Sequence, residues 1–329
     1  MADRDSHRTT VLRSFLGALT ILCASSVVAQ SQQKGDASFR VEYQYISTGT
    51  FYDDNFEFDY WTTDSHIAVL SGDYSFTDRW TVYAALPYVQ KRFNAGELFN
   101  GDPHNPNDPW WIDFVPPDKR FIDDEKFHGG FQDLTLGVQY LALDGPLTLS
   151  PYISYGVPTT DYPFYAKAAI GQNLWNIPVG FAFTFIPYFS DWYLQGNLAY
   201  VFSEKPLDVN VDYWLGFLSS GYFFTPRFSV NLFLSYKNVI KGLRMPDDFT
   251  DDPTYGNYPD DFDTVYWWQH DRLLAHKIAN LGIGFDYMLN ENYQLSGTYF
   301  QSISAEQTNE VDNAFTLALT RYWGGDGVE

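Results

Sequence analysis

Short stretches in which apolar residues alternate with polar or small ones recur along almost the whole chain. The last of them places Val311, Phe315, Leu317, Leu319 and Trp323 on one face, with polar or small residues between them. A period of two is that of a β-strand. No stretch after the N-terminal segment reaches the roughly 18 consecutive apolar residues of a membrane-spanning helix. Repeated strands behind an export signal predict a closed β-barrel in a bacterial outer membrane.

Turn residues divide the chain into twelve strands. Five connections are tight and rich in Asp, Asn, Gly or Pro, which supply the backbone angles of short turns. Six others are longer, and an even strand number places both termini on the periplasmic side. Because lipid offers no hydrogen bonds to backbone groups, the first strand must pair with the last. The fold class is therefore all-β, a closed antiparallel up-and-down transmembrane barrel. The predicted strands are 37–47, 58–76, 79–92, 130–142, 147–157, 173–189, 192–203, 207–224, 227–240, 273–289, 292–303 and 311–323.

Residues 1–29 have the pattern of a secretory signal peptide. Arg4, Arg8 and Arg13 precede the short apolar core 14–29, and small residues offer a cleavage site before Gln30. The single cysteine, Cys23, would leave with this segment, so the mature chain would hold no disulfide and no cysteine metal site. The predicted domains are the signal peptide (1–29), the barrel (30–323) and a short C-terminal tail (324–329).

Charge and aromatic content narrow the function. The net charge of −21 argues against a nucleic-acid partner, since phosphate binding needs clustered Lys and Arg. Tyr, Phe and Trp make up 19% of the chain, which suits the two aromatic belts of a barrel at the membrane interfaces. The predicted location is the outer membrane of a Gram-negative bacterium. A secreted, water-soluble β-sandwich is the rival fold.

Two long connections, 93–129 and 241–272, are rich in Asp and are expected on the outer side. Carboxylate clusters can bind Ca²⁺ or Mg²⁺, but neither segment follows the twelve-residue calcium loop. The favoured interpretation is a solvated acidic surface, bridged in part to lipopolysaccharide by ambient divalent ions, so no metal site is predicted. Aromatic residues of the two loops are expected to fold over the mouth as a gate. These are Trp110, Trp111, Tyr266, Trp267 and Trp268.

Alternation also predicts which polar side chains face the barrel lumen. In a barrel of this size the interior is narrow. Such side chains either fill it and satisfy one another or line a path for solute. The predicted lumen-lining residues are Arg40, Glu42, Asp133, Gln139, Asp212, Lys237 and Asp286.

An enzymatic role has little support in the sequence. His270 and Asp271 are adjacent, as in outer-membrane proteases that use Asp and His, but a chain this rich in Asp produces such neighbours by chance. No nucleophile motif, phosphate loop or cofactor motif is present. We therefore predict no catalytic residues and no cofactor.

The segment 129–140 (GGFQDLTLGVQY) resembles the G-x-x-D-L-x-L-G-x-x-Y strand of the family named for the "Putative MetA-pathway of phenol degradation". The segments 83–87 (YAALP) and 151–156 (PYISYG) and the aromatic last strand match it as well. The resemblance implies an outer-membrane barrel with a channel or uptake role for small compounds, aromatic ones among them. It carries over no functional residue. The long acidic loops and Arg321, two residues before Trp323, depart from the usual pattern.

The predicted function is passive uptake of small solutes, with aromatic or hydrophobic compounds as candidates, through a porin-like channel. Net acidity suggests a preference for cations or neutral solutes. Two alternatives stay open: a non-transporting structural or docking barrel with acidic outer loops, and an outer-membrane hydrolase. The expected partners are the bilayer, lipopolysaccharide and a small solute; the sequence specifies neither the solute nor the oligomeric state.

Overall fold

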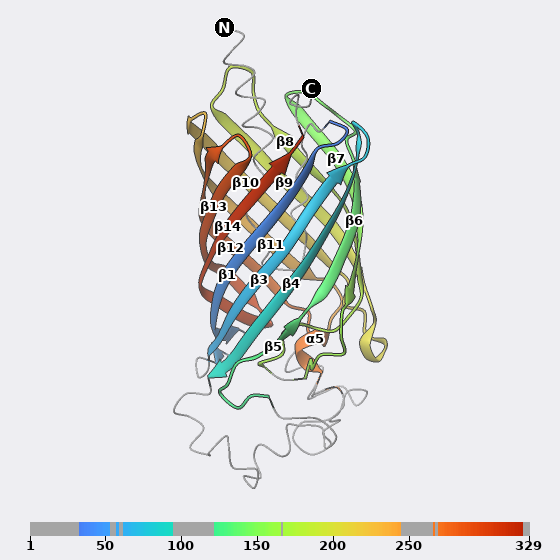
Figure 1. The fold of residues 1–329 in the computed structure, drawn as a ribbon. Coiled ribbons are helices and arrows are strands. Elements are labelled where there is room, and N and C mark those ends of the chain that lie inside the picture. Colours follow the sequence, from blue (N-terminus) through green and yellow to red (C-terminus); the bar gives the residue numbers. More distant parts are fainter. Residues whose placement is uncertain are drawn as a thin grey trace, which may run out of the picture.

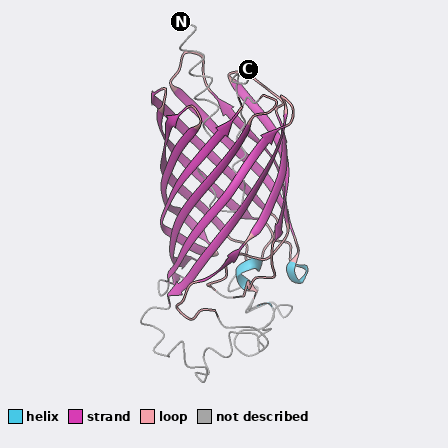
Figure 2. Cartoon of the chain, in the orientation of Figure 1, coloured by secondary structure: helices cyan, strands magenta, loops and turns pink. Residues whose placement is uncertain are grey.

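The computed structural model describes residues 33–52, 57–58, 62–94, 122–165, 167–244, 266 and 269–324. These residues form one antiparallel sheet that closes into a barrel (Figure 1). The predicted signal peptide and nearly all of the predicted tail lie outside the described residues. Strand dominates the described chain, and the short helical turns lie near the end opposite the termini (Figure 2). No described helix is long and apolar enough to cross a membrane.

Twelve strands build the barrel wall, as predicted. Two further pieces are small: β2 (Glu57–Phe58) pairs with the end of β1, and β5 (His128–Phe131) pairs with β4 just before β6 begins. The wall strands are β1 (Ala37–Tyr52), β3 (Thr62–Ser75), β4 (Trp80–Asn94), β6 (Asp133–Tyr140), β7 (Leu147–Pro158), β8 (Asn176–Phe185), β9 (Trp192–Ser203), β10 (Tyr213–Thr225), β11 (Phe228–Val239), β12 (Lys277–Asn290), β13 (Tyr293–Glu306) and β14 (Thr308–Trp323). Two helical turns, η1 (Pro206–Asp208) and α5 (His270–Leu273), complete the elements.

The barrel closes between its first and last strands. β1 pairs with β14 from Ala37 opposite Trp323 to Tyr52 opposite Thr308, with register shifts near Ser47. This pairing removes the open edges that lipid could not satisfy. The predicted closure is therefore confirmed.

The five predicted tight turns lie at the end where β1 begins and β14 ends (Figure 1). They are residues 76–79, 141–146, 186–191, 226–227 and 291–292, at the five predicted positions. One predicted long connection, 304–310, is wrong. Only Gln307 separates β13 from β14; it has a φ of 56° and is 1% exposed, and Thr308 and Asn309 extend the pairing with β1. β10 also begins at Tyr213 rather than at 207, because the residues before it turn through η1.

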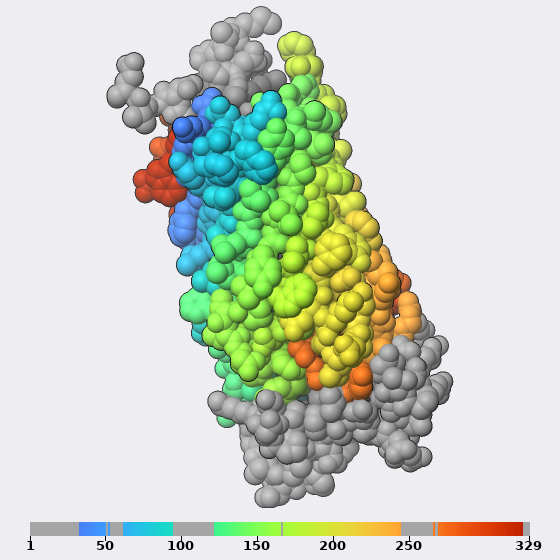
Figure 3. All heavy atoms as spheres, turned by 90° about the vertical axis from the view of Figure 1, so that its right-hand side faces the viewer, coloured from blue at the N-terminus to red at the C-terminus, as the bar shows by residue number. Residues whose placement is uncertain are grey.

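The outer face carries an aliphatic band between aromatic residues. Leu86, Leu70, Val41, Leu319 and Leu295 follow one another across four pairs of neighbouring strands. Closer to the short turns, rings meet on the surface, as where Trp80 contacts Tyr140 and Trp192 contacts Tyr222. Near the opposite end Tyr200 contacts Trp214. On the face shown in Figure 3, side chains from β6 to β10 cover the wall. This is the surface that an outer-membrane barrel presents to lipid.

A layer of three aromatic side chains lies inside the barrel, near the middle of β10, β11 and β13. The ring of Phe233 lies 5.8 Å from that of Phe217 and 6.2 Å from that of Phe300. Phe233 and Phe300 are 1% and 0% exposed. They approach the backbone of Gly282, where a Cβ atom would lie 2.3 Å from Cζ of Phe233 and 2.6 Å from Cβ of Phe300. Glycine at position 282 therefore lets this layer close.

Replacing Gly282 by alanine should destabilise the barrel by about 1–3 kcal/mol, the usual cost of forcing atoms into a packed core. Gly216 offers the matched control, because a Cβ there meets only Cδ1 of Leu198, at 3.7 Å. Urea unfolding of both variants in detergent micelles measures the difference. Equal stability of Gly282→Ala and Gly216→Ala would contradict the close packing at Gly282.

Candidate functional site

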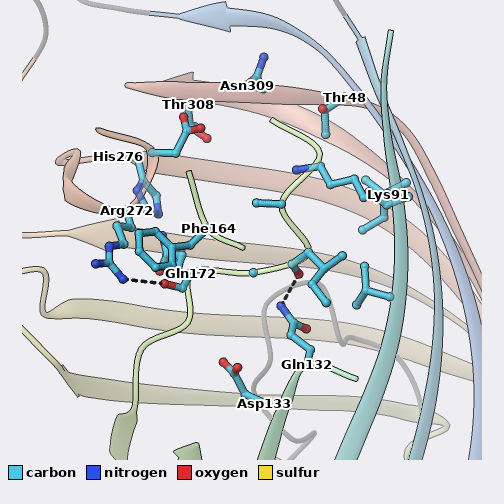
Figure 4. Close-up of a pocket in the computed structure, with 18 of the residues that line it drawn as sticks. Thr48, Lys91, Gln132, Asp133, Phe164, Gln172, Arg272, His276, Thr308 and Asn309 are labelled. Carbon is cyan, nitrogen blue, oxygen red and sulfur yellow. Dashed lines mark hydrogen bonds between the residues drawn. The ribbon is translucent and has the colours of Figure 1, made fainter. Parts of the chain in front are cut away.

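A cavity of about 390 Å³ lies inside the barrel, toward the end opposite the termini. Its wall comes mainly from β1, β3, β4, β6, β12 and β14, with single residues from β8, β9, β10 and β11. Segments 164–174 and 271–276 complete it (Figure 4). Pockets of about 300–1,000 Å³ are typical of small-molecule sites.

Alternation along β3 and β4 sets the chemistry of the wall. Thr63, Ser65 and Ile67 point inward from β3, while Val89 and Lys91 point inward from β4. Side chains two residues apart in a strand share a face. Hydroxyl groups, branched aliphatic groups and one ammonium group therefore border the same space.

The connection between β7 and β8 folds into the barrel and forms part of this wall. Tyr162 donates its hydroxyl hydrogen to Asp133. Gln132 Nε2 donates to the carbonyl of Ile170 over 2.8 Å. Ile170 packs with Val89 and Tyr162, and all three are buried. The inward fold thus attaches to the wall through one apolar cluster and several hydrogen bonds.

Asp123 also binds the connection between β7 and β8, through two backbone hydrogen bonds. Its carboxylate accepts the backbone N–H of Lys167 over 3.1 Å and that of Ala168 over 2.7 Å. Burial raises the pKa of Asp123, opposed by these bonds and by nearby lysines. The sequence identified residues 158–172 only as a long connection. Its high share of apolar residues for a loop, Ala168 and Ile170 among them, is the sequence feature that could have indicated a buried segment.

An ion pair links the connection to α5. Lys167 Nζ lies 2.7 Å from Oδ1 of Asp271, and His270 Nε2 lies 3.3 Å from the same oxygen. Burial opposes ionisation of Asp271, but the charges of Lys167 and His270 outweigh it and hold the pKa of Asp271 below its usual range. The His270–Asp271 neighbours considered for hydrolysis are thus part of an ion-pair cluster with Lys167.

Arg272 and His276 follow on the same side of the cavity. The guanidinium of Arg272 stacks over the ring of Phe164 at 3.6 Å, and its Nε donates to Gln269 over 3.0 Å. Burial lowers the pKa of Arg272 to about 10, which leaves it charged near neutral pH. Burial and the charge of Lys237 lower the pKa of His276 well below its usual value, so His276 is neutral there.

The stabilising effect of Asp271 should depend on pH in one direction. Its folded pKa lies below the unfolded value of about 3.9, so its contribution is present above about pH 4 and is lost as pH falls through the lower, folded pKa. The melting temperature of Asp271→Asn should therefore lie below that of the unaltered protein by a similar amount at about pH 8 and about pH 5. The gap should shrink below about pH 4. A gap that already closes between pH 8 and pH 5 would contradict the depressed pKa.

Two of the seven predicted lumen residues, Asp133 and Lys237, border the cavity. Lys237 is 5% exposed, and its Nζ lies 4.5 Å above the ring of Tyr213. Asp212 lies just before β10 and accepts the backbone N–H of Ser203 over 2.9 Å. All three side chains are buried.

The other four lie deeper or on other strands, and all are buried. Arg40 Nη2 lies 2.6 Å from Oε2 of Glu42. Asp286 accepts from Ser296 over 2.7 Å and from Gln294 over 2.6 Å. Gln139 is 7% exposed on β6. That these side chains line a solute path stays a prediction.

The predicted gate falls largely outside the described residues, as do most of the acidic loops 93–129 and 241–272. Trp110, Trp111, Trp267 and Trp268 are not among the described positions. Tyr266 is described and packs against an apolar cluster inside the mouth. That cluster consists of Leu174, Val209, Val211, Val239, Leu243, Leu273 and Leu274. Within the described ranges, no group of three or more His, Cys, Asp or Glu residues is placed to hold a metal ion.

Comparisons with known proteins agree with this architecture. The family model described as "Putative MetA-pathway of phenol degradation" matches residues 44–244. An outer-membrane channel from Pseudomonas putida F1 has the same fold, with a TM-score of 0.64 and 15% identity, over 90% of this chain and 98% of that one. The translocator domain of the autotransporter NalP from Neisseria meningitidis matches at a TM-score of 0.46 and 10% identity, over 87% and 88% of the two chains. No curated protein matches the sequence significantly.

Proposed function

The chain belongs to the family described as "Putative MetA-pathway of phenol degradation", and on this premise we propose that it is a channel for passive entry of small solutes. The protein is a closed twelve-stranded barrel of the bacterial outer membrane. Its apolar exterior faces lipid, and its interior carries polar and charged side chains. A polar interior inside such a barrel provides the route that a solute needs.

The cavity of about 390 Å³ is the observation that carries this proposal. It lies within the barrel wall, at the end where the longer connections lie, and it is large enough for a small molecule. Polar side chains such as Thr63 and Ser65 share its surface with apolar ones such as Ile67 and Val89. A mixed lining of this kind suits solutes with both an apolar body and a polar group.

We further propose where the channel filters solutes and which residues line the solute path. We place the outer filter at the inward connection 159–175 together with the aromatic loop residues, including Tyr266. We place the solute path along the seven predicted lumen residues, with its deeper part at Arg40, Glu42 and Asp286. We also propose that the acidic outer loops contact lipopolysaccharide.

Recordings from purified protein in planar lipid bilayers test the channel function. We expect discrete current steps, and swelling of protein-containing liposomes in small neutral solutes. Replacing Ile67 by tryptophan should lower both signals, because that side chain faces the cavity. Ile153→Trp is the matched control, since Ile153 is 48% exposed on the outer face. A correctly folded barrel that neither conducts nor admits solute would contradict the proposal and favour a docking role.

A further inference from the structure

We propose that the cavity binds a small organic anion with an apolar body, an aromatic carboxylate being the simplest example, and that Lys91 pairs with its charge. The inference rests on the channel proposed above but names the solute class that the cavity selects. It follows from three features of the described residues: an ammonium group without a partner, an excess of cations on the lining, and an apolar wall beside them.

Lys91 reaches from β4 into the cavity (Figure 4). Within the described part of the chain, its ammonium group has no hydrogen-bond or ion-pair partner. Asp123 and Asp271 are near enough to attract it, but each is held by other donors. Asp271 binds Lys167 over 2.7 Å, and Asp123 accepts the amide hydrogens of Lys167 and Ala168. A half-buried cation without a partner loses part of its hydration, and an anionic group in the cavity would offset that cost.

The charge balance of the lining points the same way. Four lining residues are cationic, namely Lys91, Lys167, Lys237 and Arg272, whereas two are carboxylates, Asp133 and Asp271. Including Asp123, which lies just behind the lining, still leaves one excess positive charge. The whole chain has a net charge of −21, so the charge of the described cavity lining is opposite in sign to that of the chain. The composition predicted a preference for cations or neutral solutes, whereas we infer an anionic solute from the charges at this site.

An apolar surface adjoins the ammonium group. Val89 precedes Lys91 by two residues on the same inward face and is 4% exposed. It packs with Ile170, and Ile67 from β3 adds to the cluster. Phe164 borders the cavity from the opposite side, beneath the guanidinium of Arg272. A hydrated inorganic ion gains nothing from this wall, whereas a ring attached to a carboxylate buries its apolar surface there.

Equilibrium dialysis of detergent-purified protein against radiolabelled benzoate tests the inference directly. We expect saturable binding of benzoate, and binding weaker by about tenfold or more for benzamide, which lacks the charge. Acetate, which lacks the ring, should compete poorly. Lys91→Met should weaken benzoate binding by about tenfold or more, while Lys91→Arg retains it. Lys34→Met is the control, because Lys34 is exposed at the end with the short turns.

Two results would overturn the inference: equal binding of benzamide and benzoate, or unchanged benzoate binding by Lys91→Met. If Lys91→Met fails to fold, the comparison of benzoate with benzamide on the unaltered protein decides alone. Dialysis needs no ion current, so the two proposals fail separately. Conductance without benzoate binding would contradict the anion site and support the channel. Benzoate binding without conductance would contradict the channel and support the anion site.

Discussion

Replacing Leu319 by arginine should destabilise the folded barrel by about 2 kcal/mol, between the roughly 0–1 kcal/mol of a charge on the lipid face near an interface and the roughly 2–4 kcal/mol of one at the bilayer midplane. Leu319 is 43% exposed on β14 and lies between Val41 of β1 and Leu295 of β13. It therefore sits in the aliphatic band, two residues along β14 from Arg321 and the rings at the rim. Urea unfolding from lipid vesicles measures the loss.

Leu289→Arg is the matched control. Leu289 is 46% exposed and lies one residue before the end of β12, beside a short turn, so arginine there should cost about 0–1 kcal/mol. The chain already tolerates an arginine close to this rim. Arg321 faces outward on β14, with its guanidinium 4.7 Å from the ring of Trp323 and 5.7 Å from that of Tyr293. Equal losses at positions 319 and 289 would mean that the aliphatic band does not mark the membrane core.

The strands and tight turns of the barrel wall were predictable because local sequence patterns specify them: alternation identifies each strand, and turn residues identify the connections at one end. The pairing of β1 with β14 followed from a second argument, because lipid cannot satisfy the backbone groups of an open sheet edge. Arg321 departs from the usual pattern of a final strand, and the structure explains it: its guanidinium stacks on the rings of Tyr293 and Trp323 at the rim. The one wrong connection, 304–310, depends on a single residue, Gln307, whose backbone angle no periodicity encodes.

The cavity was not predictable from the same rules. Its inward wall depends on contacts between distant residues, such as Ile170 with Val89 and Lys167 with Asp271. Its excess of cations depends on which few charges point inward, and composition averages over that choice. Alternation identified Asp133 and Lys237 as inward-facing. Lys91 shares the inward face of β4 with Val89 but was not among the predicted residues, and strand periodicity does not show whether such a lysine has a partner.

Replacing residues 160–172 by a Gly-Ser linker of the same length should raise the single-channel conductance several-fold. This segment joins β7 to β8 and occupies part of the barrel cross-section, with Tyr162, Ala168 and Ile170 all buried. A flexible linker would lose the hydrogen bonds to Asp133 and Asp123 and the packing against Val89. The wall strands do not depend on the segment, because each is paired with two neighbours.

The control for this exchange is the same kind of linker at the opposite end, in the turn 186–191. Tyr188 and Phe189 in that turn are 76% and 92% exposed, so the exchange should leave the conductance unchanged. The shift in gel mobility on heating shows whether each variant is folded. A folded 160–172 variant with unaltered conductance would place the narrowest point deeper, at the layer of Phe217, Phe233 and Phe300. That outcome would make the cavity a vestibule in front of the constriction, and a double Phe233→Ala and Phe300→Ala variant would then be expected to conduct more.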